Sequence, residues 1–105
     1  MNPLIFGPKL WFVIHTSAVY YSNIPDEYEK KMMYNFIISL PILVPCSTCK
    51  QNLISWLIKN KESLPVALNN RTNLFIFFIN LHNDVNKLLK KKEISLNEAK
   101  IIWNF

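Results

Sequence analysis

Apolar and polar positions alternate with helical spacing along nearly the whole chain. Apolar side chains recur at intervals of three and four residues, which places them on one face of an α-helix. The clearest example is the stripe of Tyr28, Met32, Phe36 and Leu40, which we expect to face the core. The pattern predicts four long helices and a short fifth one, over about residues 8–21, 26–39, 47–59, 73–91 and 95–103.

Prolines and capping residues mark the ends of these predicted helices. Pro8 suits a first helical position, because its missing N–H would have no partner there. Two prolines bracket a short apolar link at residues 42–44, which we expect to separate the second helix from the third. Thr72 is the predicted N-cap of the fourth helix. Ser95 and Glu98 match a capping box, which predicts the start of the last helix.

The composition supports one all-α domain over residues 1–105. Half of the residues are hydrophobic, so a core can form and disorder is not expected. Gly7 is the single glycine, which disfavours β-hairpins and excludes a glycine-rich phosphate loop. Residues 1–6 do not resemble a signal peptide, and the longest apolar run, 74–79, is too short to span a bilayer. We therefore expect no stable membrane insertion.

The net charge of +5 comes largely from one patch, formed by Lys87 and residues 90–92. Such a patch can bind nucleic acid, an anionic membrane surface or an anionic cofactor, and it can equally be a solvated helix end. Its lysines gather at one helix end and do not alternate with exposed aromatic residues, so nucleic acid is not the expected partner.

Only Cys46 and Cys49 offer redox or nucleophilic chemistry, and they form a CxxC pair at the start of the third predicted helix. The N–H groups and dipole of a helix N-terminus lower the pKa of a thiol there, which favours thiol–disulfide exchange. A zinc site needs four ligands, and the other strong candidates, His15 and His82, lie far apart in the sequence. No metal site is therefore expected. Two inert buried thiols are the remaining alternative.

A polar stripe on the fourth predicted helix suggests where an electron acceptor could bind. Asparagine is a poor helix former, so a stripe of His82, Asn83, Asn86 and Lys90 requires an explanation. The stripe can face a polar, anionic ligand, or it can simply face solvent. In the same way, Trp11 and the histidine four residues later can form a core pair or a flat wall for a stacked ring system.

Three stretches together resemble the Erv/ALR family of FAD-linked sulfhydryl oxidases. Residues 6–15 read FGPKLWFVIH and are similar to the family's (W/F)GPxxWxxxH motif. Residues 45–49 read PCSTC, similar to its PCxxC, and residues 82–90 read HNDVNKLLK, similar to its HNxVNxxLxK. The three occur in the family's order, and Trp103 falls where the family has an aromatic residue against the flavin. The link before PCxxC looks longer than in the family pattern.

The resemblance implies an all-α, four-helix bundle with a short fifth helix, usually a homodimer, and FAD at the mouth of the bundle. Lys90 would lie near a phosphate, and Trp103 would close the site. The full set of implied cofactor-binding residues is Gly7, Lys9, Trp11, His15, Cys49, Phe78, His82, Asn83, Val85, Asn86, Lys90 and Trp103.

The resemblance also implies a reaction. A substrate thiolate attacks Cys46, the outer cysteine, while Cys49 passes the electron pair to FAD, and O2 is finally reduced to hydrogen peroxide. The chain lacks the further cysteines of many cellular members, so it would act directly on a thiol-containing partner, such as a thioredoxin-like or small CxxC relay protein. This minimal form resembles those of large cytoplasmic DNA viruses, which implies the host cytoplasm or the virion.

Two other functions remain open from the residues alone. The first is a small basic helical binding module, for nucleic acid or an acidic partner, with structural cysteines. The second is a redox adaptor that binds no flavin. Bound flavin absorbance in the purified protein would separate both from an oxidase.

Overall fold

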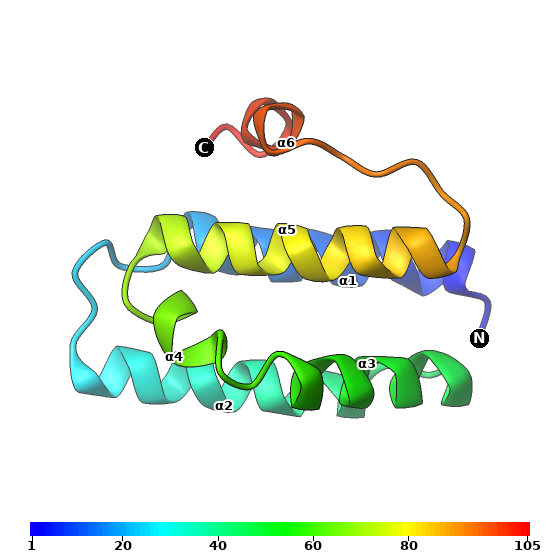
Figure 1. The fold of residues 1–105 in the computed structure, drawn as a ribbon, viewed down its shortest axis with the longest axis horizontal. Helices are drawn as coiled ribbons and strands as arrows, with labels where there is room; N and C mark the ends of the chain where they lie inside the picture. Colours follow the sequence, from blue (N-terminus) through cyan, green and yellow to red (C-terminus); the bar gives the residue numbers. More distant parts are fainter.

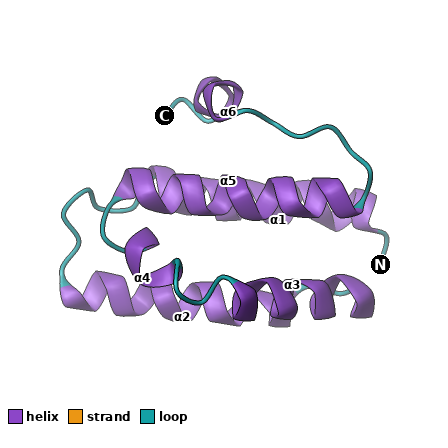
Figure 2. Cartoon of the chain, in the orientation of Figure 1, coloured by secondary structure: helices purple, strands orange, loops and turns teal.

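The computed structural model describes residues 1–105 and contains helices and loops but no strand (Figure 2). This confirms the predicted all-α fold. The helices are α1 (Pro3–Val19), α2 (Glu27–Leu43), α3 (Ser47–Lys59), α4 (Leu64–Ala67), α5 (Arg71–Leu88) and α6 (Leu96–Ile102).

The long helices form two layers (Figure 1). Helices α1 and α5 lie side by side in one layer, and α2 and α3 form the other. The short α4 connects the layers, and α6 packs across the outer side of the α1–α5 pair. No helix combines the length and the apolar character needed to cross a bilayer.

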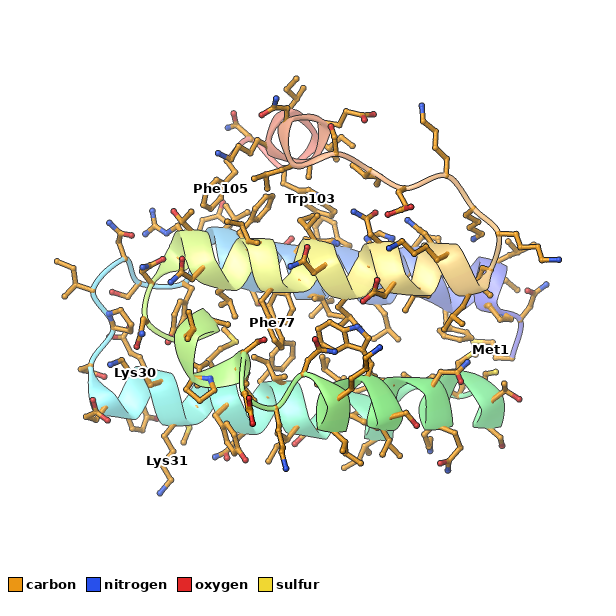
Figure 3. All side chains as sticks on the ribbon, viewed as in Figure 1. Met1, Lys30, Lys31, Phe77, Trp103 and Phe105 are labelled. Carbon is orange, nitrogen blue, oxygen red and sulfur yellow. The ribbon has the colours of Figure 1, made fainter.

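The core is organised around the first half of α5, which is apolar on nearly all sides. Leu74, Phe75 and Phe78 have no exposed surface, as the sequence predicts for this segment. Phe77 points from α5 into the space between the two layers (Figure 3). Burying large aromatic and aliphatic side chains is the main stabilising term in a domain of this size.

Helix α1 begins five residues earlier than predicted. Asn2 is the N-cap, and its side chain accepts a hydrogen bond from the N–H of Leu4 at 2.9 Å. Pro3 then occupies the first turn, where a missing N–H has no consequence. Pro8, predicted to open the helix, lies inside it. The residue before it is Gly7, which has no Cβ to clash with the proline ring.

The predicted link at residues 42–44 is wrong, because α2 continues through Pro41 to Leu43. Pro41 is buried, so its packing offsets the hydrogen bond that its ring nitrogen cannot donate. The true connection to α3 is only Val44, Pro45 and Cys46. A short connection fixes the start of α3 closely relative to the end of α2.

The boundaries of α5 also differ from the prediction. Asn70, not Thr72, is the N-cap, and its side chain accepts from the N–H of Asn73 at 2.8 Å. The short helix α4 precedes α5 in the chain, where the sequence predicted only a connection. The capping box of Ser95 and Glu98 at the start of α6 is confirmed.

Helix α5 ends in a Schellman motif. The N–H of Lys91 donates to the carbonyl of Asn86 at 2.8 Å, and the N–H of Lys90 donates to that of Lys87 at 3.1 Å. Lys90 occupies the left-handed position of this motif, with φ 57°, where glycine is the usual residue. The chain therefore turns sharply after α5 and runs back toward α6.

Candidate functional site

The two cysteines lie at the N-terminus of α3, as predicted. Cys46 is the N-cap residue, and its sulfur accepts a hydrogen bond from the N–H of Cys49 at 3.3 Å. The two sulfur atoms are 2.7 Å apart, and both thiols are free. Pro45 cannot continue the preceding helix, and Cys46 has the extended backbone of an N-cap.

The pKa values of the two thiols shift in opposite directions. The hydrogen bond from the Cys49 thiol lowers the pKa of Cys46, and the backbone N–H of Cys49 lowers it further. Burial raises the pKa of Cys49, and the neighbouring Cys46 raises it as well. Cys46 is therefore the better thiolate of the pair and also the better leaving group.

Facing α3, a stack of aromatic rings connects α1 with α5. The rings of Trp11 and His82 are nearly parallel, at 7°, with centroids 3.9 Å apart. His15 lies behind them, and its Nε2 is 2.8 Å from Nδ1 of His82. The ring of Trp103, which follows α6, lies 5.0 Å from that of His15. The structure thus brings together Trp103 and three residues that the sequence analysis selected from two separate motifs.

Both histidines are neutral near pH 7. Burial lowers the pKa of His15 to about 3, and the charge of His82 contributes. Burial also lowers the pKa of His82 to about 4, with a smaller effect from Lys91. A neutral imidazole has one donor and one acceptor nitrogen, so one ring donates and the other accepts in the bond between them. Nδ1 of His15 is buried without any hydrogen-bond partner.

A cavity of about 530 Å³ opens between α1, α3 and α5, beside this stack. This volume lies within the usual range for a site that binds a small molecule or cofactor. The cavity is lined mostly by apolar side chains. The predicted site residues that line it are Gly7, Trp11, Cys49, His82, Val85, Asn86 and Trp103. Cys46 does not line it, so the two cysteines are not equivalent.

Five predicted site residues lie outside the lining. Lys9 and Lys90 are exposed, Phe78 belongs to the core, and His15 lies behind His82. Asn83 holds the loop before α6: its Nδ2 donates to the carbonyl of Ile94 at 2.7 Å, and its Oδ1 accepts from that residue's N–H at 2.8 Å. The cofactor contacts predicted for these five residues and for the seven lining residues remain predictions.

The cavity also has lining residues that the sequence reading missed. Trp56 and Asp84 contribute polar atoms from α3 and α5, and Lys91 and Lys92 lie beside Lys90, where the resemblance had placed the phosphate contact. The signal for Trp56 was its position seven residues after Cys49, which puts both on one helical face. The structure contains no group of three or more His, Cys, Asp and Glu side chains that could hold a metal ion.

The sequence is similar to FAD-linked sulfhydryl oxidases along most of its length. The sequence matches the model of the Erv1 / Alr family over residues 8–104. It is 36% identical over 100 residues to the FAD-linked sulfhydryl oxidase of African swine fever virus (isolate Pig/Kenya/KEN-50/1950), a match that covers 95% of this chain and 81% of that protein. It is 28% identical over 85 residues to the FAD-linked sulfhydryl oxidase ERV2 of Saccharomyces cerevisiae, covering 81% of this chain and 41% of that protein.

The fold has a solved counterpart. The crystal structure of the FAD binding domain of Erv1 from Saccharomyces cerevisiae superposes with a TM-score of 0.88 at 24% identity, covering 98% of this chain and 94% of that one. At this level of identity the comparison establishes the shared helical fold.

Proposed function

The chain belongs to the Erv1 / Alr family, and we propose that it is a FAD-dependent thiol oxidase in which Cys46 meets the substrate and Cys49 serves the cofactor. The observation that supports these roles is the position of the CxxC pair. Cys49 lines the cavity beside Trp11 and His82, and Cys46 does not. The alternative of a basic binding module leaves this arrangement without a purpose.

The residues of the cavity suit FAD. Trp11 and His82 present flat rings at the wall, suited to a stacked ring system. Lys91 and Lys92 supply positive charge for phosphates at one edge of the cavity. Nδ1 of His15 is a buried polar atom without a partner directly behind this wall. With the histidine pair neutral, Nε2 of His82 remains available for a polar contact.

The protein residues carry the thiol chemistry, starting from a Cys46–Cys49 disulfide. A substrate thiolate attacks Sγ of Cys46, the bond between the two cysteines breaks, and Cys49 leaves as a thiolate on the side of the cavity. A second substrate thiolate attacks the substrate sulfur of the mixed disulfide. This step forms the substrate disulfide and releases Cys46 as a thiolate, which the backbone N–H of Cys49 stabilises.

Bound FAD supplies two-electron acceptance from the reduced cysteine pair and transfer of those electrons to O2, which yields hydrogen peroxide. The residues of this chain orient the reacting partners. Helix α3 presents Cys49 to the cavity, and the Trp11 and His82 rings provide the opposing wall. The largely apolar lining keeps water from the thiolate.

The physiological substrate is a protein thiol, and we propose a thioredoxin-like or small CxxC relay protein, because the chain has no third cysteine to carry electrons onward. The likeness to a viral relative supports action in the cytoplasm of an infected cell or in the virion. A homodimer is supported by apolar side chains that α1 and α2 leave exposed. These include Leu4, Ile5, Phe12, Tyr28, Met32 and Ile38. The prediction that Tyr28 and Met32 face the core is therefore wrong, since the two side chains are 70% and 41% exposed.

The test starts with absorbance of the purified protein, which should show bound flavin. Oxidation of a model dithiol should consume O2 and produce hydrogen peroxide. Cys46→Ser and Cys49→Ser should each abolish this oxidation. Cys49→Ser should also retain the partner protein as a mixed disulfide on Cys46, which mass spectrometry identifies. A protein that binds no FAD would refute the proposal, and full activity in Cys49→Ser would refute the roles of the two cysteines.

A further inference from the structure

The helix that carries both cysteines is tied to α2 by a short connection, and its side chains Leu53, Trp56 and Leu57 pack against the core while staying partly exposed. Helix α3 has no fully buried residue, and it packs on α2 in the layer opposite α5 (Figure 1). Its face toward the cavity consists of Cys49, Asn52, Leu53 and Trp56. This spacing of three and four residues defines one side of a helix, so a small rotation of α3 moves the whole set together.

One side-chain hydrogen bond joins this face to α5 across the cavity. Nε1 of Trp56 donates to Oδ2 of Asp84 at 2.7 Å. The Trp56 ring also meets the edge of Phe77, with centroids 5.2 Å apart and planes at 72°. Asp84 in turn pairs with Lys87 at 3.6 Å. An indole N–H has only a donor and a carboxylate only acceptors, so the two groups are matched.

We propose that the hydrogen bond between Trp56 and Asp84 is a positioning contact that fixes the rotation of α3 and so keeps the Cys49 sulfur directed into the cavity. The inference rests on the roles proposed above for the two cysteines and adds a residue pair that neither the resemblance nor the comparisons assign. Trp56 and Asp84 act through Cys49 and take no part in the bond changes themselves.

The geometry explains why one hydrogen bond suffices. Trp56 lies seven residues after Cys49, close to two full turns, so both side chains leave the helix in nearly the same direction. Fixing the Trp56 end therefore fixes the direction of the Cys49 end, about 10 Å away along the axis. A displacement of the reacting sulfur by about 1 Å can slow a reaction about a hundredfold.

Three substitutions separate the hydrogen bond from its surroundings. Trp56→Phe removes the donor and keeps a ring against Phe77. Asp84→Ala removes the acceptor, whereas Asp84→Asn keeps an acceptor oxygen and removes the charge. Lys87→Ala is the matched control, because it removes the ion pair of Asp84 and leaves the bond to Trp56 in place.

The first measurement is the rate at which a dithiol reduces the bound flavin in the FAD-loaded protein, followed by its absorbance in the absence of O2. We expect Trp56→Phe and Asp84→Ala to slow this step by about tenfold or more, within the range that misplacement produces. Asp84→Asn and Lys87→Ala should remain within about twofold of the unchanged protein, since both keep the bond.

The second measurement does not depend on turnover. In a Cys46→Ser background, with FAD bound, only Cys49 reacts with iodoacetamide. We expect Trp56→Phe and Asp84→Ala to raise its alkylation rate several-fold, because rotation of α3 turns the half-buried thiol toward solvent. Rescue by Asp84→Asn would distinguish positioning from a general loss of stability, which thermal unfolding records in parallel.

Several results of these two measurements would overturn the proposed role of the hydrogen bond. Unchanged flavin reduction and unchanged alkylation in Trp56→Phe and Asp84→Ala would overturn the proposal. An Asp84→Asn variant as slow as Asp84→Ala would also overturn it, because the charge and not the hydrogen bond would then matter. If the unchanged protein itself binds no FAD, the proposed function fails first, and this result is distinct from an effect of the variants. If Trp56→Phe does not fold, the comparison of the two Asp84 variants still decides.

Discussion

Asn83 joins α5 to the loop that leads into α6, and its replacement by alanine tests what that connection does. Its amide makes two hydrogen bonds with the backbone of Ile94, at 2.7 and 2.8 Å. These bonds hold the loop between α5 and α6, and this loop carries α6 and then Trp103 to the cavity. Asn83→Ala removes both bonds and leaves the rest of the helix unchanged.

The expected loss follows from the two bonds. Each neutral intramolecular hydrogen bond contributes about 1 kcal/mol net, so together they contribute about 2 kcal/mol to the free energy of unfolding. Ile94 is half-buried, and water can replace part of what is lost. For a domain of this length, about 2 kcal/mol corresponds to a fall of about 10 °C in Tm. The affinity for FAD should fall as well, because Trp103 is then no longer held against His15.

Asn80→Ala is the matched control. Asn80 lies on the same helix and is exposed. Its replacement by alanine is the same chemical change, but it removes no side-chain hydrogen bond. Alanine is the better helix former, so this control should be neutral or slightly more stable. Thermal unfolding of both variants, measured without FAD, gives the comparison. If Asn83→Ala unfolds within about 0.5 kcal/mol of Asn80→Ala, the two bonds do not hold the loop as described.

The remaining predictions concern pH, backbone strain and ligand. The folded chain keeps His15 neutral down to a pKa of about 3, while an unfolded histidine takes up a proton near pH 6.5. The contribution of the neutral histidines to the free energy of unfolding is therefore fully present above pH 6.5 and is lost as the pH falls. At pH 5 the loss from His15 reaches up to about 2 kcal/mol, and the loss from half-buried His82 is smaller. Urea unfolding at pH 7.5 and 5.0 checks this, and a loss that persists undiminished in His82→Gln would argue against any share for that residue. Lys90→Gly should stabilise the protein by about 0.5–1 kcal/mol, since it relieves the left-handed backbone at φ 57°, whereas Lys92→Gly should not. Finally, FAD at about 100 times its Kd should raise the free energy of unfolding by about 2.7 kcal/mol, and a Tm that does not respond to FAD would contradict binding to the folded state.

The sequence predicted the start of α3 from its apolar spacing and the start of α6 from its capping box. The start of α3 at Cys46 and of α6 at Ser95 are both confirmed. Two of the errors came from prolines. Pro8 and Pro41 were treated as boundaries, yet both lie inside helices. Local preference predicts a break at proline. At Pro41 burial in the core, which no local pattern reveals, outweighs that preference, whereas the exposed Pro8 follows Gly7, which has no Cβ to clash with its ring.

The sequence predicted those residues of the candidate site that belong to recognisable motifs. Trp11 and His15 were chosen from one stretch and His82 from another, and the structure brings them together. Contacts that depend on how helices pack across the cavity could not be predicted. The hydrogen bond between Trp56 and Asp84 spans 28 residues and joins two helices whose relative rotation no motif specifies. The two hydrogen bonds between the Asn83 side chain and the Ile94 backbone could not be predicted either, because they depend on where the loop before α6 lies.

The sulfur that meets the substrate is also the group that caps α3. The sulfur of Cys46 accepts a hydrogen bond from the N–H of Cys49, so each turnover changes the strength of the hydrogen bond that caps α3. A thiolate is a strong acceptor for that N–H, while a sulfur in a disulfide carries no charge and accepts weakly. The first turn of α3 should therefore fray more in the oxidised state than in the reduced one. Exchange of the Cys49 amide hydrogen would report the redox state of the enzyme from its own backbone, without any signal from the flavin.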